Sequence, residues 1–127
     1  MKPLIISNNP SVIARYDEAF FVSGDFIDVL YKVRDLIHKG HQLISHPLGS
    51  SGRMMSSPYR SVLVSIDAGP FNAEHCGIVE SSIEMYHAKM GLGEADHSSG
   101  KDYELIDLEL LESSLSEADI ITDTKEL

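Results

Sequence analysis

The segment from Asp25 to Gly40 constrains the fold most, because it carries a complete set of signals for one amphipathic helix. Asp25 is a residue type that commonly caps helix N-termini, and Lys39-Gly40 places a cation and then a glycine at the expected end. The apolar residues recur at spacings of three and four and share one face: Phe26, Val29, Leu30, Val33, Leu36 and Ile37. The sequence therefore predicts a helix over residues 25–39 that buries this face against another element.

Four short apolar runs predict β-strands around this helix. They cover residues 2–7, 19–22, 42–45 and 61–66. Further helices are predicted over residues 10–16 and 72–90 and from residue 102 onward. Such alternation is typical of an open α/β sheet, in which right-handed crossovers make the first three strands parallel neighbours. We therefore expect a three-layer α/β fold with a mostly parallel open sheet of about four strands and flanking helices; the orientation of the fourth strand stays open.

The length of 127 residues fits one domain. We expect a single α/β domain over residues 1–115 and an acidic, mobile C-terminal tail over residues 116–127. The last predicted helix has an unusually broad apolar face, which indicates contact with more than one neighbour. A second copy of the chain is therefore a candidate partner.

The formal net charge of −10 is distributed unevenly along the chain. Residues 1–63 contain seven basic and five acidic residues, whereas residues 64–127 contain three basic and 15 acidic residues. Because a net negative charge repels polyanions, we expect neither nucleic acid nor a membrane as a partner. No apolar run approaches the roughly 18 residues of a membrane span. A single cysteine, Cys76, excludes an internal disulfide and favours the cytoplasm as location.

Residues 36–66 carry no carboxylate side chain, although the chain as a whole is acidic. Ligands of open α/β sheets bind beyond the carboxyl ends of strands, and two polar segments, residues 7–9 and 46–53, follow predicted strands there. The second segment resembles a phosphate-binding loop in composition but matches no Walker loop or dinucleotide fingerprint. An ordinary connecting loop is the alternative. We predict a site for a small anion (phosphate, acyl phosphate or carboxylate) formed by Asn8, Asn9, His46, Ser50, Ser51, Arg53 and Arg60.

Histidine, serine and cysteine residues form no recognisable catalytic or metal centre in the sequence. His41 and His46 lie at opposite ends of a predicted strand and point to opposite faces, while His38 and His41 have no evident third ligand. We therefore expect no metal and no cofactor. No Gly-x-Ser-x-Gly motif is present, and Cys76 is interpreted as a buried, inert thiol on the apolar face of a helix. Binding is thus favoured over catalysis.

Several stretches resemble a known protein family. They are residues 4–10 (LIISNNP), 33–50 (VRDLIHKGHQLISHPLGS), 58–62 (PYRSV) and 103–111 (YELIDLELL). Together they resemble the GrdX family, which comprises small proteins encoded beside the glycine, sarcosine and betaine reductase components of amino-acid-fermenting anaerobes. The resemblance extends over residues 3–115 and implies reductase subunits as candidate partners, but it implies no particular reaction.

Three functional hypotheses follow, in this order of preference. The first is an accessory protein of the reductase system that binds a small anion at the strand ends. The second is a protein–protein adaptor whose acidic second half contacts a reductase subunit. The third is a small hydrolase of phosphate or acyl-phosphate compounds with His46 as acid or base. The reductase catalyst itself is excluded, because a lone cysteine cannot cycle through a disulfide within one chain.

Overall fold

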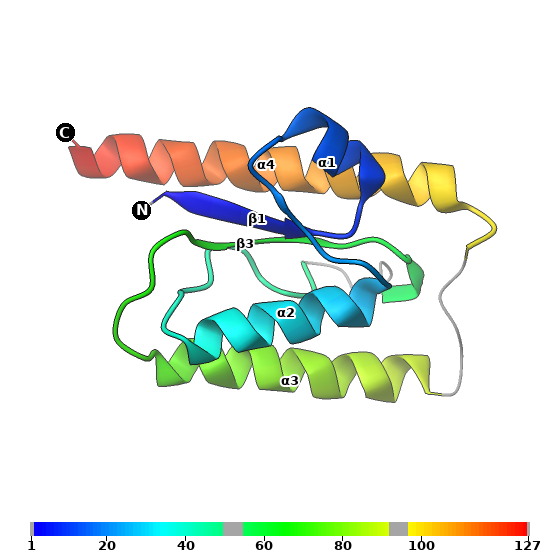
Figure 1. Ribbon diagram of the computed structural model, residues 1–127, viewed down its shortest axis with the longest axis horizontal. Helices are drawn as coiled ribbons and strands as arrows, with labels where there is room; N and C mark the ends of the chain where they lie inside the picture. The colour runs from blue at the N-terminus through cyan, green and yellow to red at the C-terminus, as the bar shows by residue number, and fades with distance from the viewer. Residues whose placement is uncertain (1, 50–54, 92–96, 127) are drawn as a thin grey trace.

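The computed structural model describes residues 2–49, 55–91 and 97–126 and places a small sheet between helices (Figure 1). In chain order the elements are β1 (Pro3–Ser7), α1 (Pro10–Arg15), β2 (Phe20–Phe21), α2 (Phe26–His38), β3 (Ser61–Ser65), α3 (Ala73–Met90) and α4 (Gly100–Glu126). The expected mixed α/β class is confirmed. Each helix predicted from the sequence is present, because its periodicity and its capping residues are local signals.

The sheet differs from the expected one in strand number and direction. Within the described residues it has three strands in the order β2-β1-β3. The two-residue β2 is parallel to β1, whereas β3 is antiparallel to β1 over its full length, with Pro3 opposite Ser65 and Ser7 opposite Ser61. The prediction of a mostly parallel, four-stranded sheet was therefore wrong. β3 begins beside Ser7 at the end of β1 and finishes beside Pro3 at its start, so it runs in the opposite direction to β1.

Residues 42–45, predicted to be the third strand, form a single antiparallel bridge between Leu43 and Val64. Side chains occupy the backbone groups that a longer ladder would need. The N–H of Gln42 donates to Oγ of Ser65 (2.8 Å), and the N–H of Leu63 donates to Oγ of Ser45 (2.8 Å). Because each backbone N–H has one strong hydrogen bond to give, these contacts limit the ladder to one bridge.

Alternate residues of β1 and β3 face opposite sides of the sheet, and helices cover both sides (Figure 1). On one side, Ile6 and Val62 belong to a large core cluster with apolar residues of α2 and α3. On the other side, Ile5 and Leu63 pack in a smaller cluster with a valine of α1 and Leu111 of α4. The expected three layers are therefore present: α1 and α4, the sheet, and then α2 with α3.

The turn that ends α2 depends on a glycine. Gly40 has a φ of +107°, and a Cβ there would collide with the carbonyl group of Gly69. The N–H of Gly69 donates to the carbonyl oxygen of Gly40 (2.9 Å). This close approach ties the end of α2 to the loop that leads from β3 into α3, and it brings the end of α2 beside the start of α3.

The last helix is the longest element of the fold. α4 runs from Gly100 to Glu126, so residues 116–126, expected to form a tail, continue this helix (Figure 1). The mobility of residues 116–127 stays a prediction. Among the described residues, no helix is both long enough and apolar enough to cross a membrane.

Candidate functional site

Polar segments gather at one end of the sheet, where β1 and β2 finish and β3 begins. Ser7, the last residue of β1, lies opposite Phe21 in β2 and Ser61 in β3. The segment after β1, the connection from β2 to α2 and the segment leading into β3 therefore meet there. This is the end of the sheet at which the sequence predicts an anion site, and Asn8, Asn9 and Arg60 all lie there.

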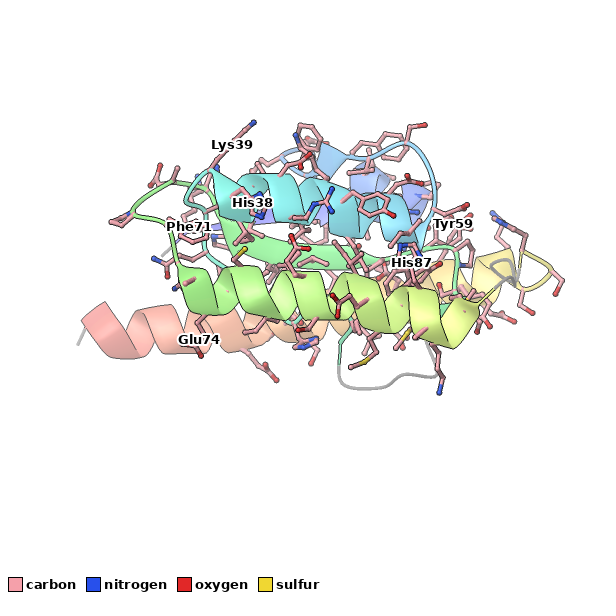
Figure 2. All side chains as sticks on the ribbon, turned by 90° about the horizontal axis from the view of Figure 1, so that it is seen from below. His38, Lys39, Tyr59, Phe71, Glu74 and His87 are labelled. Atoms are coloured by element: carbon pink, nitrogen blue, oxygen red, sulfur yellow. The ribbon has the colours of Figure 1, made fainter. Side chains whose placement is uncertain are left out.

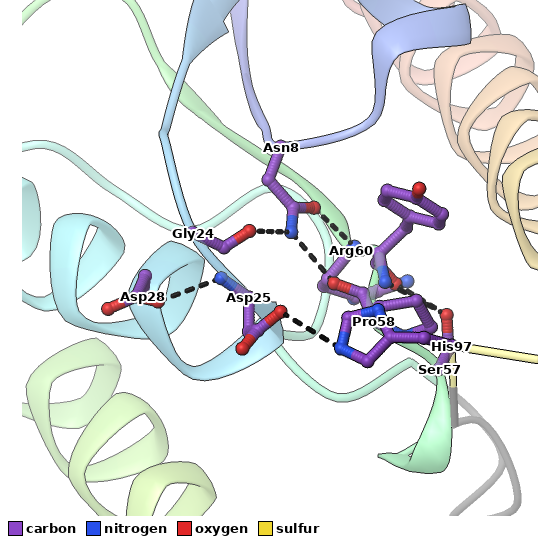
Figure 3. Close-up of polar contacts among 9 residues, drawn as sticks. Asn8, Gly24, Asp25, Asp28, Ser57, Pro58, Arg60 and His97 are labelled. Atoms are coloured by element: carbon purple, nitrogen blue, oxygen red, sulfur yellow. Dashed lines mark hydrogen bonds and ion pairs between the residues drawn. The ribbon is translucent and has the colours of Figure 1, made fainter. Parts of the chain in front are cut away.

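Asn8 joins two of these segments through its side-chain amide (Figure 3). Its Nδ2 donates to the carbonyl oxygens of Gly24 (2.9 Å) and Pro58 (2.7 Å). Its Oδ1 accepts from the backbone N–H of Arg60 (2.9 Å). Asn8 is almost fully buried, and these contacts use both of its Nδ2 hydrogens as well as its oxygen. The amide thus fixes the loop before α2 against the chain entering β3.

Arg60 holds the turn at residues 46–49 against the end of β3. Its guanidinium is buried, with 7% of the residue exposed. Nε donates to the carbonyl oxygen of Pro47 (2.8 Å), and Nη2 donates to the carbonyl oxygen of His46 (2.7 Å). The structure therefore brings Arg60 and the His46-Pro47 turn together, as expected, and the arginine stabilises the turn through its carbonyl groups.

Electrostatics at this turn keep His46 neutral. Burial lowers the pKa of His46 from its usual 6.5, and the positive charge of Arg60 lowers it further. The neutral ring accepts the N–H of Leu48 at Nδ1 (3.1 Å). Burial also lowers the pKa of Arg60, and the negative charge of Asp107 opposes that shift. The guanidinium stays protonated at neutral pH because its ordinary pKa is far higher.

Asn9 points to the other face of the sheet, where it meets a buried carboxylate. Its Nδ2 donates to Oδ2 of Asp107 (3.0 Å) and to the carbonyl oxygen of Glu104 (2.9 Å), and its Oδ1 caps α1. Asp107 also accepts from the backbone N–H of Ser61 (2.9 Å) and from its hydroxyl group (2.7 Å). The hydroxyl groups of Ser61 and Ser7 are 2.7 Å apart. This network joins α4 to β1 and β3.

Asp107 was not predicted as part of the site, although the sequence carries a signal for it. The residue lies four positions before Leu111 and therefore shares the buried face of α4. A carboxylate on a buried helix face needs donors, so it marks a polar network.

A second feature that sequence reasoning missed is an open polar pocket at the start of α4. It has a volume of about 410 Å³ and is lined by Tyr59, His97, Ser98, Ser99, Gly100, Lys101, Asp102 and Glu104. Burial raises the pKa of Tyr59, and the carboxylates of Glu104 and Asp25 raise it further. Nε2 of His97 lies 3.7 Å from Oδ1 of Asp25 (Figure 3). Carboxylates therefore border this pocket.

Of the predicted ligand-binding residues, Ser50, Ser51 and Arg53 lie outside the described part of the chain. Asn8, Asn9, His46 and Arg60 lie near one end of the sheet, and each makes hydrogen bonds within the protein. Their role in binding an anion stays a prediction.

The outer face of α4 carries apolar side chains in contact with solvent. Leu105 is 57% exposed, and Ile106 and Leu110 are each 38% exposed. Ile106 and Leu110 are four residues apart and share a face, and Leu105 lies beside them. The acidic residues Asp102, Glu109 and Glu117 are exposed on the same side of the helix. We call Leu105, Ile106 and Leu110 the α4 apolar patch.

The chain is similar to a known protein family. The family model described as GrdX-like protein matches residues 4–116, which is most of the chain. No curated protein and no solved structure matches the chain.

Proposed function

Since the chain belongs to the GrdX-like family, we propose that it is an accessory protein of the glycine, sarcosine and betaine reductase system that binds a reductase subunit through the outer face of α4. The α4 apolar patch carries this proposal. Hydration of exposed apolar side chains is unfavourable, so burying them in a protein interface lowers the free energy. This ranks the adaptor role above the binding of an anion.

The adaptor role ranks above anion binding because the polar groups at the strand ends already have hydrogen-bond partners. Asn8, Asn9 and Arg60 direct their polar groups to acceptors and donors of the protein itself. An anion there would have to compete with these bonds. The α4 apolar patch faces no such competition, because its side chains are exposed.

Charge determines the kind of surface that fits this face. Asp102, Glu109 and Glu117 are exposed around the α4 apolar patch. The partner surface should therefore have an apolar centre bordered by lysine and arginine side chains. A second copy of the chain fits less well, because two α4 helices packed through this face would bring carboxylates together.

The test is the affinity of the untagged protein for purified reductase subunits, measured by isothermal titration calorimetry. Replacing Ile106 and Leu110 together by serine should weaken binding about 7- to 50-fold. Each residue is 38% exposed, so its burial in the interface contributes about 0.6–1.1 kcal/mol of the roughly 1.5–3 kcal/mol for a fully exposed side chain. Met85→Ser is the matched control. Met85 is 54% exposed, on α3 in the opposite layer, and its replacement should leave the affinity unchanged (Figure 1).

Salt gives a second readout in the same experiment. Affinity should fall as ionic strength rises, since rim charges attract less when screened. Binding to no subunit, or equal losses in the Met85 variant and the double variant, contradicts the adaptor role. Self-association abolished by the double variant assigns the face to a second copy instead and also contradicts it.

Binding of a small anion at the strand ends is the second candidate. The observation that favours it is the contact of Asn8 with Arg60, which holds the His46 turn; Arg60 and this turn belong to residues 36–66, which carry no carboxylate side chain. Titration with phosphate and acetyl phosphate tests it. Binding should be lost in Arg53→Ala and retained in Arg15→Ala, whose exposed side chain pairs with Glu112 (3.3 Å). No heat with either ligand contradicts this candidate.

A further inference from the structure

Three side chains with different metal-binding atoms meet where α2 ends and α3 begins. His38 is the last residue of α2, and Cys76 and Glu80 lie in the first half of α3. One nitrogen of His38, the thiol sulfur of Cys76 and a carboxylate oxygen of Glu80 all lie within 4.8 Å of one another. The two helices lie side by side, with His38 at their junction (Figure 2).

The backbone places these three groups together independently of any ligand. Cys76 and Glu80 are four residues apart and therefore project from the same face of α3. His38 is brought to that face by the turn at Gly40, whose contact with Gly69 fixes the end of α2 beside the loop entering α3. The positions of the three donors thus follow from the packing of two helices.

The distances suit a tetrahedral ion after small side-chain rotations. Zinc bonds of about 2.0–2.3 Å place neighbouring ligand atoms roughly 3.5 Å apart in a tetrahedral site. Nε2 of His38 and Oε1 of Glu80 are already 3.4 Å apart. The remaining donor separations are at most 4.8 Å, so they close by a rotation about side-chain bonds.

Charge at this position favours a divalent cation. A thiolate and a carboxylate together carry two negative charges, which balance the two positive charges of Zn²⁺. A neutral imidazole completes the donor set. His38 lies at the C-terminal end of α2, where the helix dipole contributes partial negative charge. Lys39 points away from α3, and the ring of Phe71 packs edge-on against His38 with centroids 6.5 Å apart (Figure 2).

We propose that His38, Cys76 and Glu80 bind Zn²⁺, with a further coordination position taken by water or by a group from a bound molecule. Among the residues that the structure describes, the group contains three protein ligands, as in zinc sites with an exchangeable position. The proposal goes beyond the adaptor function and does not depend on it, because α2 and α3 lie on the opposite side of the sheet from α4 (Figure 1). The sequence predicts no third ligand for His38, because Cys76 and Glu80 belong to a helix formed much later in the chain.

The test uses the untagged, reduced, full-length protein titrated with ZnCl₂ by calorimetry and with CoCl₂ by absorbance. The wild type should bind one Zn²⁺ per chain. His38→Gln, Cys76→Ser and Glu80→Gln should each weaken binding at least about 100-fold, since even changes in the outer shell of a site cost about 10- to 100-fold. Glu74→Gln, exposed on the side of α3 away from α2 (Figure 2), and His87→Gln, seven residues beyond Glu80, are the matched controls and should bind like the wild type.

Cobalt gives a readout that only one residue can produce. The chain has a single cysteine, so a thiolate-to-cobalt charge-transfer band can come only from Cys76. The band should appear in the wild type and disappear in Cys76→Ser. Circular dichroism establishes that each variant is folded, and Glu80→Gln, at a half-exposed position, keeps the test valid if Cys76→Ser does not fold. Absence of stoichiometric Zn²⁺ binding by the wild type, a band that persists without Cys76, or equal losses in the controls overturns the proposal.

Discussion

Replacement of Asp107 by alanine should destabilise the protein strongly, because this buried carboxylate connects α4 to the sheet. Asp107 is 2% exposed and accepts three hydrogen bonds, two from Ser61 and one from Asn9. A hydrogen bond to a charged group contributes about 1.5–3 kcal/mol, and a buried donor left unpaired costs about 1–3 kcal/mol. In the alanine variant, the amide of Asn9 keeps its hydrogen bond to the Glu104 carbonyl oxygen, and the hydroxyl group of Ser61 keeps its hydrogen bond with the hydroxyl group of Ser7. The backbone N–H of Ser61, however, loses its acceptor.

The expected loss in free energy of unfolding is about 3 kcal/mol, since relief of the desolvation of the carboxylate offsets part of the lost hydrogen bonding. This is a large share of the roughly 5–15 kcal/mol by which a domain is stable. Arg60 contributes to the loss, because the negative charge of Asp107 favours its buried, protonated form. Asp107→Asn should fall between the wild type and the alanine variant, because its carbonyl oxygen still accepts from Ser61.

Urea unfolding followed by circular dichroism measures the effect. The midpoint should fall while the slope of free energy against urea concentration stays constant, which shows that the change lies in stability and not in the extent of unfolding. Glu109→Ala, an exposed acidic residue of the same helix, is the control and should change the free energy of unfolding by less than about 0.5 kcal/mol. An Asp107→Ala variant as stable as this control would refute the reasoning.

Three further predictions concern the turns around the sheet. Arg60→Met removes the two hydrogen bonds to the turn at Pro47 and should cost about 2–4 kcal/mol in urea unfolding; a loss below about 0.5 kcal/mol contradicts a structural role for the guanidinium. His46 should titrate below pH 6.5 by NMR, because its pKa is lowered in the folded protein. The stability linked to this shift is present above pH 6.5 and is lost as the pH falls through the folded pKa. A titration midpoint at or above pH 6.5, or the same acid destabilisation in His46→Gln, contradicts this prediction. Gly40→Ala should destabilise the protein by about 1–3 kcal/mol, because φ is positive there and the new Cβ would collide with the carbonyl group of Gly69. Gly77→Ala, in α3 with open space around it, should stabilise the protein by about 0.5–1 kcal/mol. Equal effects of the two substitutions in thermal unfolding contradict this prediction.

The helices could be predicted because their signals lie within a few residues of each other. For α2, the capping box of Asp25 and Asp28 and the six buried apolar residues belong to one continuous segment. The neighbours in the sheet could not be predicted in the same way. Whether residues 42–45 form a strand depends on Ser65, which lies on β3 and whose hydroxyl group takes the N–H of Gln42. The direction of β3 likewise depends on contacts between segments far apart in the sequence, such as that of Arg60 with Asn8.

The candidate site shows the same division between local and distant information. Asn8 and Arg60 meet because β3 is antiparallel to β1, which places the start of β3 beside the end of β1, and the sequence left this direction open. The burial of Arg60 depends on the carbonyl groups of a turn 13 residues earlier and was not foreseen. Asp107 had a readable signal, because a carboxylate on a buried helix face requires donors. Cys76, interpreted as a buried and inert thiol, is half-buried, and its neighbours His38 and Glu80 are recognisable only once α2 and α3 are packed.

The central functional claim is that the outer face of α4 binds a reductase subunit, and methyl NMR tests it most directly. Leucine and isoleucine methyl groups of the 14.0 kDa protein are labelled and the sample is titrated with unlabelled reductase subunits. Signals of Leu105, Ile106 and Leu110 should shift or broaden, while that of Ile37, buried in α2, should not. If no subunit alters the three α4 signals, or if changes are confined to the strand-end loops, the adaptor function is contradicted.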